Sequence, residues 1–196
     1  MTTALQLEKR EVLTGGHVKG GIICAHLEWV RQYHGDDALA SLLGMLGSTV
    51  RSEVESAVGP SWCSFDALIA LDRAIQNRFG RGRDFMRELG RYSAHLNLST
   101  TYRLFQRENV LEFLRRSSLL HAQFQDFGRI ECRQLAGTTC EMRHAGARCY
   151  SPIWCSSAVG YYEQVIVMHG GTFVTVEEVL CQCDGDEECV FRLQWR

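Results

Sequence analysis

Residues 172–196 read TFVTVEEVLCQCDGDEECVFRLQWR, and this stretch decides the class of fold. Its first part, up to Cys183, is rich in the β-branched and apolar residues that favour strands. The acidic segment DGDEE contains a glycine and predicts a tight turn, and CVFRLQWR predicts a closing strand. We therefore expect the chain to end in an antiparallel β-hairpin.

The segments between residue 118 and the hairpin have a similar character. One helix is predicted over about 152–168, because Pro152 suits a first helical turn and Gly170-Gly171 ends the apolar periodicity. Three short strands are predicted before it: LLHAQFQDF (119–127), GRIECRQLAG (128–137) and TTCEMRHAG (138–146). The second half thus predicts an antiparallel sheet crossed by one late helix.

The first half has helical periodicity instead. Helices are predicted at about 19–34, 36–46, 50–58, 64–75, 83–106 and 108–117. Asp36 or Asp37 is expected to cap the second of these helices, and Ser64 the fourth. Helices followed by strands predict an α+β fold, with the helical N-terminal half packed on the sheet.

The chain length of 196 residues suits one domain with a sizeable core. Residues 1–17 are polar and end in the breaker Gly15-Gly16, so they are predicted to be a flexible N-terminal segment. Residues 18–196 are predicted to form a single domain.

Composition excludes several classes of function. A net charge of −2 and a pI near 6.4 give no general attraction to nucleic acid or to anionic lipid. The first residues lack the apolar run of a signal peptide, and no stretch is long enough to span a membrane, so a cytoplasmic location is expected. In a reducing compartment, the 9 cysteines point to metal binding or packing before disulfides.

Four potential metal ligands follow one another in this second half. Cys155 lies near the start of the late helix, while Glu178 and Cys181 lie near the end of the next strand. Cys189 opens the last strand, so the hairpin can bring it next to Cys181. Three thiolates and one carboxylate suit tetrahedral zinc, and four protein ligands would make the site structural. The soft thiolates argue against calcium, although the turn is acidic.

SPIWCSSAVGYYEQV (151–165) and VEEVLCQCDGDEECVF (176–191) resemble the C-terminal part of the 4-vinyl-reductase-type ligand-binding domain. That domain occurs in sensor modules of bacterial activators that respond to phenols and toluenes, and in standalone bacterial relatives. The helical first half looks like the standalone relatives. The resemblance implies a zinc-clamped hairpin with ligands Cys155, Glu178, Cys181 and Cys189. It also implies helices packed on one antiparallel sheet, similar to the TRAPP subunits.

The resemblance to the 4-vinyl-reductase-type domain further implies a pocket for a small hydrophobic ligand. Aromatic-sensing modules hold a phenol hydroxyl with a histidine and a tryptophan, but GRIECRQL contains no tryptophan and the nearest histidine is His121. The polar anchor for a phenol is therefore not evident. Residues predicted to line the pocket, with plain core packing as the alternative for the aromatic ones, are Tyr102, Phe105, Phe113, His121, Phe124 and Tyr162.

Taken with the resemblance, these residues predict a non-enzymatic, zinc-stabilised sensor that signals through a homodimer or a partner protein. One alternative is a ligand-free interaction scaffold of the same fold. Another is a reductase or accessory protein of pigment biosynthesis, which would need a redox cofactor site that the sequence does not display. Covalent catalysis by a cysteine–histidine pair has no recognisable local signature here.

Other groups have simpler interpretations. Cys183 lies on the same strand face as Cys181 and could replace Glu178 as a ligand. Cys132, Cys140 and Cys149, with His144, match no zinc spacing and are assigned to packing. The arginine-rich segment RFGRGRDFMRELGR (78–91) would suit an acidic partner, but a solvated helix face is the default interpretation.

Overall fold

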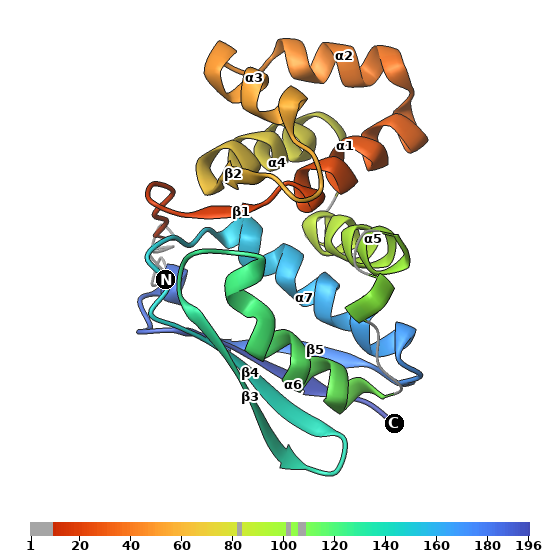
Figure 1. Cartoon of the computed structure of the whole chain (residues 1–196), viewed down its shortest axis with the longest axis vertical. Helices are drawn as coiled ribbons and strands as arrows, with labels where there is room; N and C mark the ends of the chain where they lie inside the picture. The colour runs from red at the N-terminus through yellow and green to blue at the C-terminus, as the bar shows by residue number, and fades with distance from the viewer. Residues whose placement is uncertain (1–9, 82–83, 101–102, 106–108) are drawn as a thin grey trace, which may run out of the picture.

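The computed structural model describes residues 10–81, 84–100, 103–105 and 109–196 (Figure 1). Its helices are α1 (Gly21–His34), α2 (Asp36–Gly44), α3 (Ser48–Ser56), α4 (Phe65–Phe79), α5 (Phe85–Ser99), α6 (Val110–Leu120) and α7 (Pro152–Met168). Its strands are β1 (His17–Lys19), β2 (Trp62–Ser64), β3 (Arg129–Ala136), β4 (Thr139–Ala145), β5 (Thr175–Leu180) and β6 (Cys189–Gln194). The 3₁₀ turns are η1 (Arg103–Phe105), η2 (His121–Gln123) and η3 (Gln182–Asp184).

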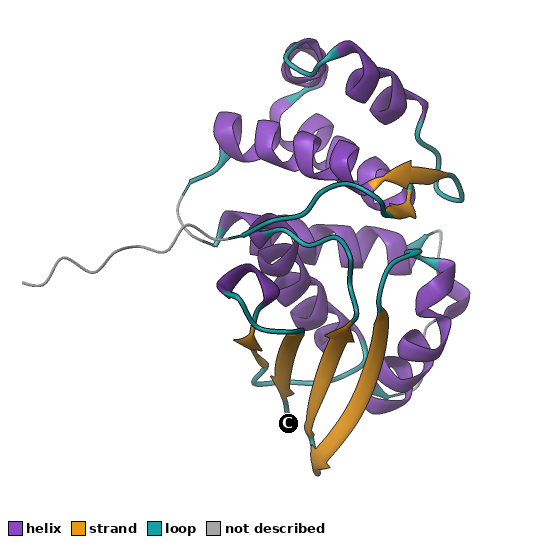
Figure 2. Cartoon of the chain, turned by 90° about the vertical axis from the view of Figure 1, so that its left-hand side faces the viewer, coloured by secondary structure: helices purple, strands orange, loops and turns teal. Residues whose placement is uncertain are grey.

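The molecule has a helical layer above a four-stranded sheet (Figure 2). The sheet is antiparallel, in the order β3-β4-β6-β5, and β1 pairs separately with β2. Helix α7 lies between the sheet and α5, while α1 to α4 form the far end of the molecule (Figure 1). One apolar core therefore fills the space between α6, α7 and the sheet, and a second lies among α1, α4 and α5.

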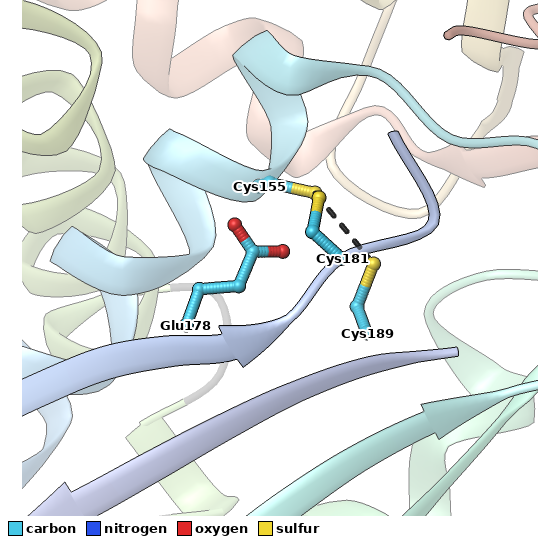
Figure 3. A group of neighbouring side chains, drawn as sticks. All are labelled: Cys155, Glu178, Cys181 and Cys189. Atoms are coloured by element: carbon cyan, nitrogen blue, oxygen red, sulfur yellow. Dashed lines mark hydrogen bonds between the residues drawn. The ribbon is translucent and has the colours of Figure 1, made fainter. Parts of the chain in front are cut away.

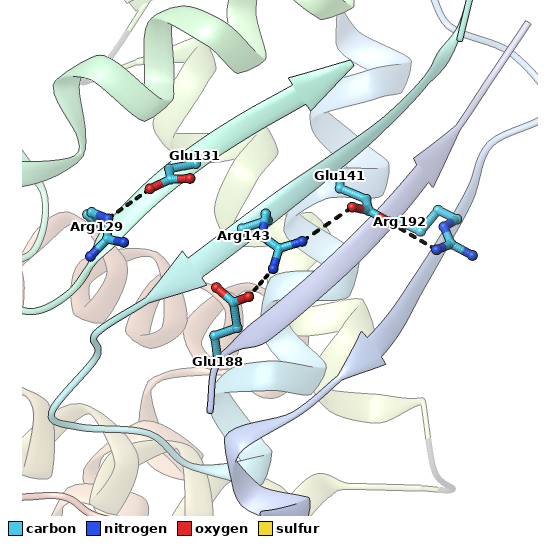
Figure 4. Close-up of polar contacts among 6 residues, drawn as sticks. All are labelled: Arg129, Glu131, Glu141, Arg143, Glu188 and Arg192. Carbon is cyan, nitrogen blue, oxygen red and sulfur yellow. Dashed lines mark hydrogen bonds and ion pairs between the residues drawn. The ribbon is translucent and has the colours of Figure 1, made fainter. Parts of the chain in front are cut away.

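The two faces of the sheet differ because side chains alternate along each strand. Cys140, Met142 and Phe191 point into the core and are buried. The opposite face carries ion pairs, both within a strand and between neighbouring strands, that Figure 4 shows. On this outer face the Arg192 guanidinium lies 2.9 Å from Glu141, and Arg143 pairs with both Glu141 and Glu188. Only the inner face is thus available to form an interior site.

Helices α5 and α7 pack in direct backbone contact. A Cβ atom added to Gly160 would overlap the Arg87 carbonyl oxygen, and one added to Gly90 would overlap the Ser157 carbonyl oxygen. Two arginines of α5, Arg87 and Arg91, also converge on the buried Glu163 of α7. Glycine at both crossing positions is what lets the two helices approach this closely.

We expect Glu163→Gln to lower the free energy of unfolding by about 2 kcal/mol, because hydrogen bonds to a charged group are lost. The Glu163 carboxylate accepts from Arg87 Nε at 2.9 Å and from Arg91 Nε at 2.8 Å. Urea unfolding would measure the change. The control is Glu131→Gln, whose partner Arg129 is exposed, and it should cost less than about 0.5 kcal/mol. Equal losses in both variants would show that the Glu163 contact adds no special stability.

The N-terminal residues from Arg10 onward lie against the body of the protein. The Arg10 backbone N–H donates to the Cys183 carbonyl at 2.8 Å, and Val12 pairs with Tyr150. Glu11 contacts both Arg73 of α4 and Ser151. These contacts tie the last hairpin to the helical layer. The flexible segment predicted for residues 1–17 includes residues 1–9, which lie outside the described part, and the boundary at residue 18 remains a prediction.

The predicted α+β class is confirmed, and the late helix covers the predicted range 152–168. The predicted packing of the helical N-terminal half on the sheet is wrong for α1 to α4, because α6 and α7 cover the sheet and α1 to α4 lie beyond α5. Ser64 caps α4 as predicted, since its hydroxyl accepts from the Ala67 N–H. Asp36 and Asp37, however, form the first turn of α2 behind Gly35, where their charge suits the helix dipole.

The strand predicted over 119–127 is wrong. Asn109 caps α6, which continues to Leu120, and η2 follows directly. Within the described residues, no helix combines the length and the apolar character that crossing a bilayer requires.

Candidate functional site

The four predicted metal ligands lie together at the base of the last hairpin. Figure 3 shows Cys155, Glu178, Cys181 and Cys189 pointing toward one point, and their ligand atoms all lie within 4.8 Å of one another. The Cys155 sulfur is 3.8 Å from the sulfurs of both Cys181 and Cys189. The three cysteines are buried. The helix start, the end of β5 and the start of β6 thus place three thiols and one carboxylate in one spot.

Local irregularities bring these side chains together. Regular alternation would place Glu178 and Cys181 on opposite faces of β5, because they are three residues apart. The register between β5 and β6 shifts between Glu178 and Leu180, and such a bulge re-aims the following side chains. The turn then depends on Gly185, whose φ of 105° favours glycine, and on Asp186, which accepts from the Cys181 N–H at 2.8 Å.

Glu178 has an unusual environment for a carboxylate. Burial raises its pKa to about 7, and its Oε1 atom is buried with no hydrogen-bond partner in the described structure. The neighbouring Cys155 thiol lowers the pKa of Cys181, while contact with the Cys181 thiol raises that of Cys155. A buried, unpartnered carboxylate oxygen beside three sulfurs is a donor set suited to a thiophilic cation.

The remaining cysteines lie outside this group of four. Cys183 is buried beside Cys155 and Cys181, but the four-member cluster contains Glu178 in its place. Cys132 and Cys140 contact each other across β3 and β4. The Cys149 thiol donates to the Thr14 carbonyl at 3.3 Å.

A second candidate site is a pocket of about 160 Å³ between α5, α6, α7 and the inner face of the sheet. It is lined by residues of α5, α6, β3, β4 and α7, by the segment around η2, and by Lys19 and Ile22 on either side of the start of α1. Four predicted residues line it: Phe113, His121, Phe124 and Tyr162. The other two, Tyr102 and the side chain of Phe105, lie outside the described part of the chain.

The polar side chains that line this pocket are two imidazoles, two phenols, two amides, three serine hydroxyls, one ammonium and one guanidinium, from His121, His144, Tyr161, Tyr162, Asn97, Gln125, Ser93, Ser117, Ser157, Lys19 and Arg116. His144 Nε2 lies 2.7 Å from the Tyr162 hydroxyl, and burial lowers the pKa of His144 to about 3. Burial also lowers the pKa of His121, whose Nε2 lies 3.2 Å from the Phe127 carbonyl oxygen. Both histidines are therefore neutral near pH 7.

Sequence reasoning missed His144 and Asn97 as pocket residues. His144 follows the inward positions Cys140 and Met142 at intervals of two, so the strand pattern could have placed it on the inner face. Asn97, which donates to Ser93 Oγ at 3.2 Å, carried no such signal, because the path of α5 across α7 sets its position.

No protein-family model and no curated protein matches the chain. Solved structures do. An H-NOX protein from S. oneidensis in the Fe(II)NO state superposes with a TM-score of 0.71 at 14% identity, over 91% of this chain and 99% of that one. An oxygen-binding H-NOX domain related to soluble guanylate cyclases gives a TM-score of 0.68 at 18% identity, over 91% of this chain and 95% of that one.

These structures overturn the predicted membership of the 4-vinyl-reductase-type family. The Cys–Glu–Cys–Cys motif fixes only a hairpin and one helix end, whereas the H-NOX match extends over 91% of the chain. The zinc-stabilised sensor is therefore wrong, as are its alternatives, the scaffold of that family and the pigment reductase. The structural zinc taken from the same family is also wrong, because similar structures are described as haem proteins. The chain has the fold of the H-NOX domains.

Proposed function

We propose that this chain is a non-catalytic, ligand-binding sensor domain, with the ligand bound in the pocket between α5, α6, α7 and the sheet. The observation that carries the proposal is an interior pocket of about 160 Å³ whose walls hold two neutral histidines. The similar H-NOX structures include one in an NO ligation state and one with oxygen, which supports a sensing role for this fold.

The size of the pocket limits the ligand. A cavity of about 150 Å³ in another protein holds a benzene molecule, so the present volume corresponds to about one ring. The lining is mostly apolar, and its hydrogen-bonding groups include the amides of Asn97 and Gln125 as well as His121, His144 and Tyr162. Such a pocket favours one ring with a single polar substituent, because apolar walls provide affinity and a few polar groups fix the orientation.

The residues present do not fit the haem that the fold implies. Pockets for drug-sized ligands measure about 300–1,000 Å³, well above this volume. The wall formed by α5 and α7 cannot open without breaking the contacts at Gly90 and Gly160 and the Glu163 ion pairs. His144, a neutral imidazole of the kind that ligates iron, already contacts the Tyr162 hydroxyl.

The proposed output is a change in how α5 and α7 present their outer surfaces to a second protein, either another copy or a different partner. Both helices line the pocket on one side and reach the protein surface on the other. A ligand acts in this way only if it binds the two arrangements of the helices with different affinity.

Calorimetric titration with benzene and phenol tests the pocket, because the two probes differ by one hydroxyl group. We expect both to bind and phenol to bind about tenfold more tightly, which corresponds to one net hydrogen bond. Ala158→Leu, which places extra carbons in the pocket wall, should abolish both signals. The control is Ala122→Leu, because Ala122 is exposed in η2, and this variant should bind benzene and phenol like the unmodified protein.

Titration with haemin is the opposing measurement. If haemin gives the Soret band of a bound haem with the unmodified protein and this band is absent in His121→Ala, the pocket binds haem and the proposed ring-sized ligand is contradicted. Absence of benzene and phenol binding in the intact protein, or binding that survives Ala158→Leu, would also overturn the proposal. Turnover of a reduced nicotinamide or flavin would overturn the non-catalytic assignment.

We also propose that Cys155, Glu178, Cys181 and Cys189 bind one thiophilic divalent metal ion. The support is the clustering of the four ligand atoms within 4.8 Å and the unpartnered Glu178 oxygen. Such an ion would connect the start of α7 to the ends of β5 and β6. Elemental analysis of the purified protein would identify the ion.

A further inference from the structure

A second, larger concavity lies on the outer side of α5. It is an open groove of about 960 Å³ formed by the ends of α1 and α4, by α5 and by one residue of α7. In Figure 1, α1 and α5 cross near each other at this end of the helical layer. Its volume lies within the range of small-molecule sites, about 300–1,000 Å³. None of its lining residues belongs to the interior pocket.

Aromatic side chains form one wall of this groove. Trp29 lies 5.5 Å from Tyr33, and Tyr33 lies 6.0 Å from Tyr92, measured between ring centroids. His34 stacks on Phe79 at 4.0 Å. The wall is partly open to solvent, because Tyr33 is 59% exposed. Tyr92 is held in place by its hydroxyl, which donates to Gln32 at 2.7 Å.

Positive charge gathers beside this wall. Arg78 and Arg81 line the groove at the end of α4, and neither forms an ion pair within the described residues. The Arg78 guanidinium lies 5.5 Å from the Phe79 ring, so charge and ring surface adjoin. Arg91 is already paired with Glu163, and Glu88 is the one carboxylate among the described lining residues. The groove thus carries excess positive charge, although the whole chain has a net charge of −2.

We propose that this groove binds a nucleoside phosphate. Guanidinium groups recognise phosphate through paired hydrogen bonds, and aromatic faces stack with nucleobases. A simpler ligand would use only one of the two features, the aromatic wall or the arginines. A free inorganic anion would not contact the aromatic wall, and a neutral ring compound would not use the charge of Arg78 and Arg81.

The arginine-rich segment of the sequence thus divides into two functions. Arg87 and Arg91 hold α5 to α7 through Glu163, while Arg78 and Arg81 face the groove. The inference is independent of the proposed interior ligand, because the two sites share no lining residue.

Calorimetry with AMP, adenosine and inorganic phosphate on the full chain separates the two halves of the site. AMP should bind at least about tenfold more tightly than adenosine or inorganic phosphate, because it contacts both the aromatic wall and the arginines. The double variant Arg78→Ala/Arg81→Ala should bind AMP about tenfold or more weakly. Added salt should weaken AMP binding by the unmodified protein. Tyr33→Ala should weaken AMP about tenfold and leave phosphate binding unchanged.

The matched control is Arg115→Ala/Arg129→Ala, which removes two exposed arginines outside the groove and should not change AMP binding. Circular dichroism on each variant establishes that it is folded. The inference is overturned if AMP does not bind, if phosphate alone binds as tightly as AMP, or if the Arg78/Arg81 variant and its control bind AMP equally.

Discussion

Replacing Gly160 with alanine is expected to lower the free energy of unfolding by about 3 kcal/mol, at the upper end of the cost of overpacking. The added Cβ would meet the Arg87 carbonyl oxygen, which belongs to the α5 backbone and cannot turn aside as a flexible side chain would. Relief requires α5 to move away from α7 as a whole. For a domain of this size, such a loss corresponds to a fall in melting temperature of roughly 10 °C.

Thermal and urea unfolding would measure the effect, with Gly44→Ala as the control. Gly44 ends α2 and has no atom within 4 Å of an added Cβ, so alanine there should be neutral or stabilise by up to about 1 kcal/mol. Equal stability of the two variants would show that α5 and α7 are not in backbone contact. In that case α5 and α7 could separate, and the pocket could widen to admit a porphyrin.

The parts of the fold that sequence patterns predicted are those set by short-range interactions. The last hairpin, the range of α7 and the Ser64 cap depend on residues close together in the chain. The meeting of Cys155, Cys181 and Cys189 was also predictable from one tight turn and one helix packed on the sheet, whereas Glu178 joins them through a bulge in β5 that the strand pattern does not signal. Local geometry and residue type carried enough information in these cases.

Features that depend on distant segments were not predictable in the same way. The region 119–127 contains enough apolar residues for a strand, but the Asn109 cap and the continuation of α6 determine its structure. The pocket requires the crossing of α5 over α7, which two glycines far apart in the sequence permit. The two H-NOX structures are 14% and 18% identical to the chain, too little for residue patterns to reveal the shared fold.

The prediction of a 4-vinyl-reductase-type domain failed for a related reason. A spacing of cysteines and one glutamate specifies how a hairpin meets a helix end, and different overall folds can carry that arrangement. The chain therefore combines the H-NOX fold with a cluster of three thiols and one carboxylate at the start of α7. Because Cys155 and the pocket residue Tyr162 belong to the same helix, an ion in the cluster would stiffen one wall of the pocket.

Addition of Co²⁺ to the reduced, metal-free protein is expected to produce sulfur-to-cobalt charge-transfer bands and the visible bands of a tetrahedral ion. The expected donor set is three thiolates and the Glu178 carboxylate, whose atoms lie within 4.8 Å of one another. At a free metal concentration a thousandfold above the dissociation constant, binding stabilises the folded state by about 4 kcal/mol. Chelation should remove both the bands and that stability.

Cys189→Ser tests the site directly, because it removes one sulfur whose neighbour in Cys155 lies 3.8 Å away. This variant should lose the charge-transfer bands and show no stabilisation by Co²⁺. Cys132→Ser, which removes a half-buried thiol outside the cluster, should keep both. Anaerobic conditions with a reductant are required, since neighbouring thiols could otherwise form disulfides that mimic a loss of metal binding. Identical spectra for Cys189→Ser and the unmodified protein would rule out the proposed metal site. That result would not affect the interior pocket or the groove on α5, which are tested by separate titrations.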